Sequence, residues 1–263
     1  MKYDQGARHH AKKSLGQNFL TDPNYIRKIV AAVGAEPGDS VIEIGPGLGA
    51  LTEALVESGA EITAIELDRD LARLLCERFA SSANFRLVEK DALEVDFSSL
   101  IPGRSKLVAN LPYYISTAIL QRLAEQSEAF SALVLMFQKE VVDRITARPG
   151  DSDRGFLTVI VESAFQIEKL FDIPPNAFRP APKVTSSVVR LVPKECSVTD
   201  EDAFRALVST AFMQKRKTIL NNLKVRHPNA AELLERSGID PRRRAESLTL
   251  DEWLRLSGSI LAA

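Results

Sequence analysis

Four consecutive residues near the middle of the chain, Asn110-Leu111-Pro112-Tyr113, place a polar amide, a proline and an aromatic ring directly after an apolar run. A side-chain amide accepts hydrogen bonds from an amino group, and an aromatic ring stacks on a flat base. Such a set suits an enzyme that grips a nucleobase taken out of its stack. The motif therefore indicates chemistry on the amino nitrogen of a nucleobase.

The segment 45–49, Gly-Pro-Gly-Leu-Gly, follows a short apolar run upstream of this motif. Glycines let the backbone turn sharply and approach a ligand, and the N-terminus of a following helix offers free N–H groups. Gly45, Gly47 and Ala50 also satisfy the dinucleotide fingerprint, with Glu66 about 20 residues further on. Beside methyl transfer to a nucleobase nitrogen, two alternatives stay open: an NAD-binding oxidoreductase and a purely structural tight turn.

Three acidic residues lie at the ends of expected strands: Glu43 before the glycine segment, Glu66 after the second strand and Asp91 after the third. A carboxylate at position 66 can accept hydrogen bonds from ribose hydroxyls, and Asp91 has the spacing to meet an adenine amino group. Alone, either of these two could instead cap a helix or end a strand in solvent. Glu43 and Asp91 count against an NAD-binding oxidoreductase, and the three acids together favour the binding of a nucleoside-containing cofactor.

The elements that must position these residues follow a repeated pattern between residues 40 and 140, where short apolar runs alternate with helical stretches. This alternation is typical of a parallel sheet with crossover helices, an α/β fold. Strands are expected over 41–44, 62–65, 85–88, 107–109 and 133–137, and helices over 51–58 and 70–80.

The later part of the chain changes character. The apolar runs 156–165 and 186–192 are expected as two further strands, which extend the sheet as an antiparallel pair at its edge. After Pro193 the pattern becomes helical over 202–223, 230–237 and 249–261. These segments predict a small, all-helical C-terminal domain.

The formal net charge of −1 hides two basic ends and a more acidic middle. Residues 203–263 carry 11 Lys/Arg against six Asp/Glu, and no acid interrupts 203–231. Within that stretch, the candidate RNA-binding residues are Lys215, Arg216, Lys217 and Lys224. A solvated helix face is the alternative explanation of the same charges.

Other features narrow the class of protein. The two cysteines, Cys76 and Cys196, lie far apart, and no Cys or His spacing typical of a metal site occurs, so no metal is expected. The chain holds no run of about 18 apolar residues, and its N-terminus lacks the apolar stretch of a signal peptide. A cytoplasmic protein that does not enter a membrane is expected.

The motifs described above, in this order along the chain, resemble those of class I S-adenosylmethionine methyltransferases that act on adenine N6. The resemblance rests on the segment 17–20 (Gln-Asn-Phe-Leu), the glycine segment, Glu66, Asp91 and the motif 110–114 (Asn-Leu-Pro-Tyr-Tyr). With the opening 13–20 (KSLGQNFL) and with 178–186 (Phe-x-Pro-x-Pro-Lys-Val-x-Ser), the chain is similar to the ribosomal small-subunit RNA adenine dimethyltransferases of the KsgA type. This resemblance covers residues 10–260.

The resemblance implies S-adenosylmethionine as cofactor, S-adenosylhomocysteine as its product, and a Rossmann-like domain with a mostly parallel seven-stranded sheet and helices on both faces. It implies a basic arm over 1–24 that closes over the cofactor site, a methyltransferase domain over 25–193 and a helical RNA-binding domain over 194–263. The implied cofactor residues are Asn18, Leu20, Gly45, Gly47, Glu66, Asp91 and Asn110.

The implied reaction moves four methyl groups in total to two adjacent adenosines in the 3′-terminal hairpin of small-subunit ribosomal RNA, within an immature 30S particle. A monomeric enzyme is expected. The Asn110 oxygen and the Leu111 carbonyl would accept the two N6–H bonds, and Pro112 would hold that carbonyl in place. Tyr113 would stack on one face of the base and Phe178 on the other, although Phe178 is also explained as a core ring beside a proline-rich connection.

Two rival functions share such a core. One is an enzyme that dimethylates an adenosine of 23S ribosomal RNA and confers antibiotic resistance. The other is a nucleic-acid-binding assembly or transcription factor without methyl transfer. The opening 13–20, the full motif 110–114 and the segment 178–191 that leads into a helical C-terminal region favour the small-subunit enzyme.

Overall fold

The computed structural model describes Lys12, residues 16–195 and residues 198–261. Its strands are β1 (Phe19–Leu20), β2 (Ser40–Ile44), β3 (Glu61–Glu66), β4 (Phe85–Glu89), β5 (Ser105–Asn110), β6 (Phe130–Gln138), β7 (Phe165–Ile173), β8 (Phe178–Arg179) and β9 (Ser186–Pro193). Its α-helices are α1 (Pro23–Val33), α2 (Ala50–Glu57), α3 (Arg69–Arg78), α4 (Phe97–Leu100), α5 (Ser116–Glu125), α6 (Lys139–Ile145), α7 (Phe156–Ala164), α8 (Glu201–Phe212), α9 (Ile219–Leu223), α10 (Ala230–Arg236) and α11 (Leu250–Leu261).

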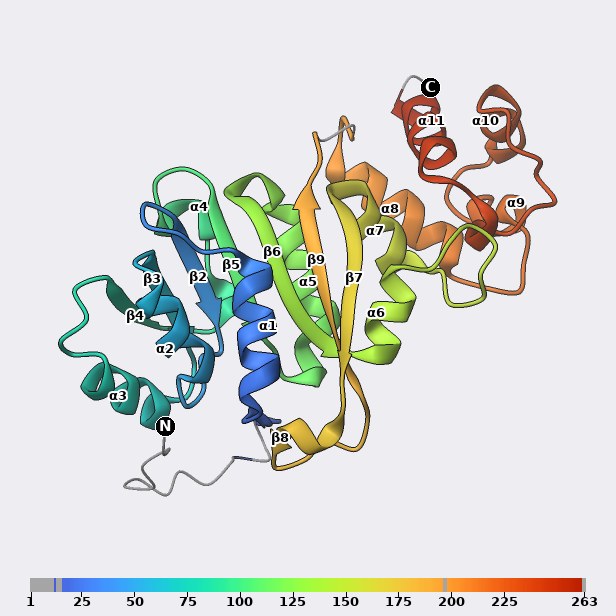
Figure 1. Ribbon diagram of the computed structural model, residues 1–263. Helices are drawn as coiled ribbons and strands as arrows, with labels where there is room; N and C mark the ends of the chain where they lie inside the picture. The colour runs from blue at the N-terminus through green and yellow to red at the C-terminus, as the bar shows by residue number, and fades with distance from the viewer. Residues whose placement is uncertain (1–11, 13–15, 196–197, 262–263) are drawn as a thin grey trace.

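A seven-stranded sheet runs through the molecule in the order β4-β3-β2-β5-β6-β9-β7 (Figure 1). Strands β2 to β6 are parallel to one another, whereas β9 is antiparallel to both of its neighbours, β6 and β7. The predicted α/β fold, its parallel strands and the strand at 186–192 are confirmed. A second sheet pairs β1 with β8, and Figure 1 shows it at the end toward which the parallel strands point.

The parallel strands are buried on both faces, which explains why their sequences are almost continuously apolar. Along β5, Leu107 and Ala109 face one hydrophobic core and Val108 faces the other. Figure 1 shows α1 across the front of the sheet and α5 behind it. Helices therefore cover both faces, and the carboxyl ends of the strands form a separate edge.

The prediction of a strand over 156–165 is wrong. This segment forms α7, and the edge strand β7 begins only at Phe165. Helix α7 buries five consecutive residues, Leu157 to Val161, because it packs against α5, α6, α8 and β7. A helix that is apolar on all sides shows no helical period in its sequence and resembles a buried strand.

The predicted helix over 202–223 is in fact two helices, α8 and α9. The buried side chain of Asn222 donates hydrogen bonds to the carbonyl of Ala211 at 2.7 Å and to that of Gln214 at 3.1 Å. These carbonyls lie at the C-terminal end of α8, where an ending helix leaves its acceptors without partners. The Asn222 amide therefore stabilises the break, and the connection between the two helices turns outward.

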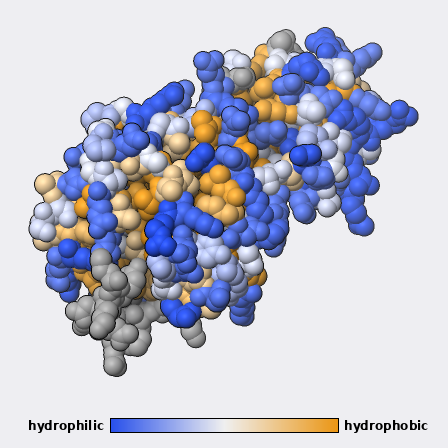
Figure 2. Space-filling view, viewed as in Figure 1, coloured by the Kyte–Doolittle hydropathy of each residue, from blue (hydrophilic) through white to orange (hydrophobic). Residues whose placement is uncertain are grey.

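The C-terminal helices pack onto the sheet through a continuous core. Helix α7 contacts both α8 and α11, and one hydrophobic cluster joins Leu133 of β6, Leu207 of α8 and Trp253 of α11. Figure 2 shows hydrophilic side chains along the outer edge of this region, at the right of the view. The division of the chain into domains at residue 193 stays a prediction.

Among the residues that the structure describes, no group of three or more His, Cys, Asp or Glu side chains could hold a metal ion. Within the same ranges, no helix has both the length and the apolar character needed to cross a bilayer. Cys196 lies outside the described residues. So do residues 1–11 and 13–15 of the predicted arm over 1–24.

Candidate active site

A cavity of about 370 Å³ opens at the carboxyl ends of β2, β3 and β5. In open α/β sheets, ligands bind at this edge, where the strand order reverses, and here the order reverses between β2 and β5. A cavity of this size suits a ligand as large as a nucleoside cofactor. Its lining includes all the predicted cofactor residues, Asn18, Leu20, Gly45, Gly47, Glu66, Asp91 and Asn110, and three residues predicted to hold the base, Leu111, Pro112 and Tyr113.

The glycine segment turns the chain out of β2 and under the N-terminal arm. Gly45 N–H donates to the Ile65 carbonyl at 2.9 Å, which ties the turn to the end of β3. Gly47 has a φ of +60°, and a β-carbon there would lie 3.0 Å from the ring of Phe19. Glycine is therefore required at 47 for both backbone conformation and space. Phe19, which sequence reasoning did not single out, forms part of the cavity wall.

Glu66 ends β3 and faces the cavity with a carboxylate that the backbone holds in place. Its two oxygens accept from the N–H of Gly47 at 3.3 Å and from the N–H of Asp68 at 2.9 Å. Burial raises the pKa of the Glu66 carboxyl, and these hydrogen bonds partly oppose that rise. A fixed carboxylate at this point can accept hydrogen bonds from the hydroxyls of a ligand.

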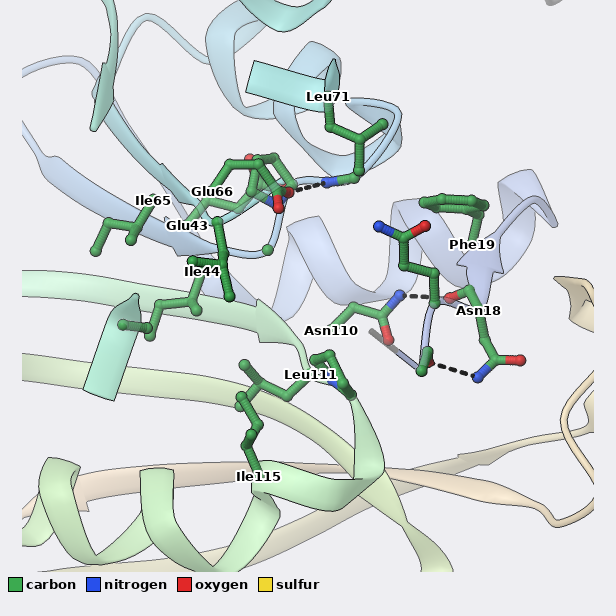
Figure 3. Close-up of a pocket in the computed structure, with 18 of the residues that line it drawn as sticks. Asn18, Phe19, Glu43, Ile44, Ile65, Glu66, Leu71, Asn110, Leu111 and Ile115 are labelled. Atoms are coloured by element: carbon green, nitrogen blue, oxygen red, sulfur yellow. Dashed lines mark hydrogen bonds between the residues drawn. The ribbon is translucent and has the colours of Figure 1, made fainter. Parts of the chain in front are cut away.

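Glu43, on β2, is a second acid in the cavity wall, and it is only 1% exposed. The Thr52 hydroxyl donates to its carboxylate at 2.7 Å. Burial raises the pKa of the Glu43 carboxyl to about 7, and the nearby charge of Glu66 adds to the rise. Figure 3 shows the two acids side by side. The cavity therefore combines apolar walls with closely spaced carboxylates, which suits a ligand that carries both hydroxyls and positive charge.

Asp91 follows β4, and its position is compatible with both a cap and the predicted cofactor contact. Its side chain accepts from the Leu93 N–H at 2.9 Å and so caps the short 3₁₀ helix over 92–94. The residue also lines the cavity and is partly exposed. Capping and ligand contact are compatible because a carboxylate has two oxygens.

Asn110, at the end of β5, connects the sheet to the N-terminal arm. Its Nδ2 donates to the Asn18 carbonyl at 3.3 Å, and the Asn18 side chain donates to the Gly16 carbonyl at 3.0 Å (Figure 3). This contact uses a donor of the Asn110 amide and leaves its Oδ1 as an acceptor directed elsewhere. The amide that the sequence predicts to hold a base is thus oriented by the arm.

The rest of the motif surrounds this amide. Pro112 has a φ of −58° and is followed by a 3₁₀ turn over 113–115. The phenol of the half-buried Tyr113 shares a hydrogen bond of 2.9 Å with the Ser186 hydroxyl, and burial raises the pKa of Tyr113. Its ring is therefore fixed and neutral. Tyr114, which sequence reasoning left without a role, also lines the cavity and is 63% exposed.

The structure does not bring Phe178 to the cavity. This ring is 1% exposed and lies in the core with Leu20, Ile26 and Ala177. The cause is the pairing of β8 with β1, in which Phe178 lies opposite Leu20. In this structure Phe178 packs against Leu20 of the arm, as expected for a core ring, and it does not face the cavity.

The predicted RNA-binding residues are exposed in the C-terminal region of the chain. Lys215, Arg216 and Lys217 lie in the connection 213–218 between α8 and α9, which we call the basic loop, and not on a helix as predicted. The Lys215 ammonium donates to the Ser152 carbonyl in the connection between α6 and α7. Lys224 is exposed at the C-terminal end of α9. Figure 1 shows this region at the opposite end of the molecule from β3 and β4.

Solved structures of similar shape define the class of protein. The structure is similar to a dimethyladenosine transferase from Plasmodium falciparum, with a TM-score of 0.80 and 28% identity over 90% of this chain and 95% of that one. It is also similar to the 23S rRNA methyltransferase ErmE, with a TM-score of 0.70 and 26% identity over 92% of this chain and 98% of that one. Together with the cavity at the strand-order reversal, these likenesses identify a class I methyltransferase fold.

The sequence places the chain within this class. It is 45% identical to the ribosomal RNA small subunit methyltransferase A of Aromatoleum aromaticum, over 97% of this chain and 96% of that protein. Residues 8–261 match the family described as ribosomal RNA adenine dimethylase, and the chain belongs to this family. The dinucleotide fingerprint in the glycine segment therefore does not mark a nicotinamide oxidoreductase.

Proposed function

We propose that the protein transfers four methyl groups in total from S-adenosylmethionine to the N6 atoms of two adjacent adenosines in the 3′-terminal hairpin of small-subunit ribosomal RNA. The substrate would be an immature 30S particle. The observation that carries the proposal is the Asn110 amide, whose Nδ2 is bonded to the arm and whose oxygen remains as an acceptor beside the acidic cavity.

The cavity residues fit the cofactor. S-adenosylmethionine, when bound, supplies a methyl group activated by a positively charged sulfur. Glu66 would accept hydrogen bonds from the ribose hydroxyls, and Asp91 would accept from the adenine amino group. The backbone from Gly45 to Gly49 would hold the amino-acid part. The fit is supported by the buried carboxylates of Glu43 and Glu66, since a positively charged ligand offsets the cost of burying two acids close together.

The residues that would bind the adenine act through their positions and through their hydrogen-bond acceptors. Adenine N6 is a poor nucleophile because its lone pair is delocalised into the ring. Acceptors at Asn110 Oδ1 and the Leu111 carbonyl would draw the N6–H bonds out of the ring plane and free the lone pair for attack. Among the described residues, no hydrogen bond is made to the Leu111 carbonyl, so it keeps its acceptor capacity. No strong general base is then required, and alignment is the main contribution of the protein.

Tyr113 would stack on the adenine, a contact worth about 1 to 3 kcal/mol. Its hydrogen bond to Ser186 fixes the ring before the base enters. In this proposal residues 25–193 carry the cofactor and base sites, and residues 194–263 bind RNA through the basic loop and Lys224. The predicted arm over 1–24, of which Lys12 and residues 16–24 are described, would enclose the cofactor.

The choice of small-subunit RNA is supported by the degree of similarity. The small-subunit relative is 45% identical to this chain, whereas the 23S enzyme ErmE is 26% identical. A target within the small subunit therefore agrees better with the sequence than the resistance-type alternative does.

The test is incorporation of labelled methyl groups from S-adenosylmethionine into unmethylated small subunits, large subunits and naked DNA, followed by nucleoside analysis. We expect N6,N6-dimethyladenosine in small-subunit RNA, and a strong loss with Asn110→Ala. Incorporation into large subunits would favour the 23S enzyme. Binding to small subunits without any incorporation would favour a non-enzymatic assembly factor.

A further inference from the structure

The N-terminal arm forms one wall of the cofactor cavity, and it is anchored on two sides. On one side, β1 pairs with β8, and the Asn18 carbonyl accepts from Asn110. On the other side, the arm reaches the turn between β3 and α3, where Asp68 lies. Residues Gly16 to Thr21, which include anchors on both sides, all line the cavity.

Asp68 receives the arm through two side chains. Its carboxylate accepts from the Lys12 ammonium at 2.6 Å and from the Gln17 amide at 2.9 Å. Lys12 also bonds to Asp70 at 2.7 Å, and its backbone N–H donates to the Gln17 side chain at 2.8 Å. The Asp68 residue is 3% exposed, whereas the Lys12 side chain is 39% exposed, so the ion pair joins a buried acid to a cation at the surface.

Asp68 also acts on the cavity through its backbone. Its N–H donates to the Glu66 carboxylate at 2.9 Å, while its side chain caps α3 by accepting from the Asp70 N–H at 3.1 Å. One residue therefore holds both the acid predicted to bind ribose and the arm that covers it. Burial alone would raise the pKa of Asp68, but the hydrogen bonds from Lys12 and Gln17 hold it below its usual range, so the charge that attracts Lys12 persists at neutral pH.

We propose that Asp68 is a positioning residue that, through its ion pair with Lys12, fixes the N-terminal arm as a wall of the cofactor cavity and so sets cofactor affinity. This inference rests on the proposed binding of S-adenosylmethionine. Removal of Lys12 takes a cation away from the buried carboxylate of Asp68 and also removes the link to Asp70, so it should loosen the arm at this position.

The test is a double-mutant cycle with Lys12→Met and Asp68→Asn. Asparagine keeps an oxygen that can cap α3 and leaves unchanged the backbone N–H that holds Glu66, while it removes the charge of Asp68 and the oxygen that accepts from Gln17. The cycle then measures how far the losses caused by the two substitutions depend on each other. Calorimetry would give the dissociation constants of S-adenosylmethionine and of the uncharged S-adenosylhomocysteine. Amide hydrogen exchange over residues 16–21 would report the arm directly, and urea unfolding would report stability.

We expect each single variant to weaken both ligands about tenfold and to speed exchange over 16–21 in the ligand-free protein. The double variant should lose clearly less than the sum of the two single losses, because both substitutions remove the contact between Lys12 and Asp68. Arg69→Met is the matched control, since Arg69 forms an exposed ion pair with Glu89 at the start of the same helix. This control should bind both ligands as the wild type does.

The inference is overturned if Lys12→Met binds both ligands within twofold of the wild type, or if the two losses add in the double variant. A variant that loses stability but keeps cofactor affinity would also overturn it, because the contact would then serve only the fold. If the wild type itself binds neither ligand, the proposed function fails, and that result is distinct from failure of this inference.

Discussion

The cofactor cavity and the basic loop, at opposite ends of the molecule, are built in contrasting ways. In the cavity, Glu43 and Glu66 are 1% and 7% exposed, and hydrogen bonds of 2.7 to 3.3 Å direct their carboxylates. In the basic loop, Arg216 and Lys217 are exposed side chains on a connection between helices. A small ligand is selected by a few buried groups of fixed direction, whereas a long polyanion is attracted by exposed charges that need no single geometry.

The largest effect should appear at Phe178, for which the resemblance implied contact with the base and a core ring was the alternative. The structure buries this ring beneath the arm. We expect Phe178→Ala to lower the free energy of unfolding by about 3 to 5 kcal/mol, because it leaves a hole in the core. Urea unfolding would measure this, with Tyr113→Ala as the matched truncation of a half-buried ring. If Phe178→Ala keeps its stability but no longer forms the dimethyl product, Phe178 contacts the base and does not serve the core.

Asn110 tests the directed part of the cavity. We expect Asn110→Ala to lower the rate of methyl transfer about 10²- to 10³-fold, since it removes an acceptor aimed at the reacting nitrogen. Single-turnover assays on small subunits would measure the rate, and calorimetry should show a much smaller change in cofactor affinity. Asn176→Ala, an exposed asparagine away from the cavity lining, is the control. A rate within threefold of wild type would remove Asn110 from the reaction.

Glu66 tests whether the buried acids select the cofactor. We expect Glu66→Gln to weaken S-adenosylmethionine binding about 10- to 100-fold, as loss of a charged hydrogen-bond acceptor implies. Binding to small subunits should not change, because the basic loop is untouched. Glu61→Gln, at the exposed start of the same strand, should change neither property. Equal weakening by both substitutions would point to general charge and not to this site.

Glu43 should make the stability of the protein depend on pH. Because its pKa rises from 4.5 to about 7 on burial, the folded state keeps a proton that the unfolded state loses between these values. The contribution of Glu43 to the free energy of unfolding of the wild type therefore falls as the pH rises from 4.5 to about 7. We expect Glu43→Gln to be more stable than wild type by about 1 to 3 kcal/mol at pH 8 and nearly equal to it at pH 4. Urea unfolding at both pH values would reveal any uniform difference, which would contradict this assignment.

The smallest effect should come from the basic loop. We expect the double variant Arg216→Gln/Lys217→Gln to bind small subunits roughly one order of magnitude more weakly, with a shallower dependence on salt, because two phosphate contacts are lost. Cofactor affinity should stay the same. Arg69→Gln removes a similar exposed charge beside the cavity and serves as control. Unchanged binding and an unchanged salt slope would assign the loop to a solvated surface.

The sequence was most informative where local pattern and position along a strand decide the structure. The runs 41–44, 62–65 and 107–109 were predicted as strands because burial on both faces leaves an apolar segment bounded by glycine or polar residues. Parallel strands bring their carboxyl ends to one edge, so Glu66, Asp91 and Asn110 could be placed together from their positions alone.

Sequence reasoning was least informative where contacts between residues far apart in sequence decide the structure. Helix α7 lacks a helical period because it is buried on all sides. For Phe178 the sequence left both a ring against the base and a core ring open, because its direction depends on pairing with the arm more than 150 residues earlier. Sequence reasoning did not single out Asp68, whose contact with Lys12 spans 56 residues of sequence. No local pattern reports such contacts, although a charged residue two positions after a cavity acid is a signal worth testing.

The most direct test of the division between cavity and basic loop is a crossed measurement on two variants. Affinity for S-adenosylmethionine and affinity for unmethylated small subunits would be measured side by side for Glu66→Gln and for Arg216→Gln/Lys217→Gln. We predict that the first variant loses only cofactor affinity and the second only subunit affinity. Loss of both affinities in either variant, or of neither in both, would contradict the assignment of cofactor and RNA binding to separate ends of the molecule.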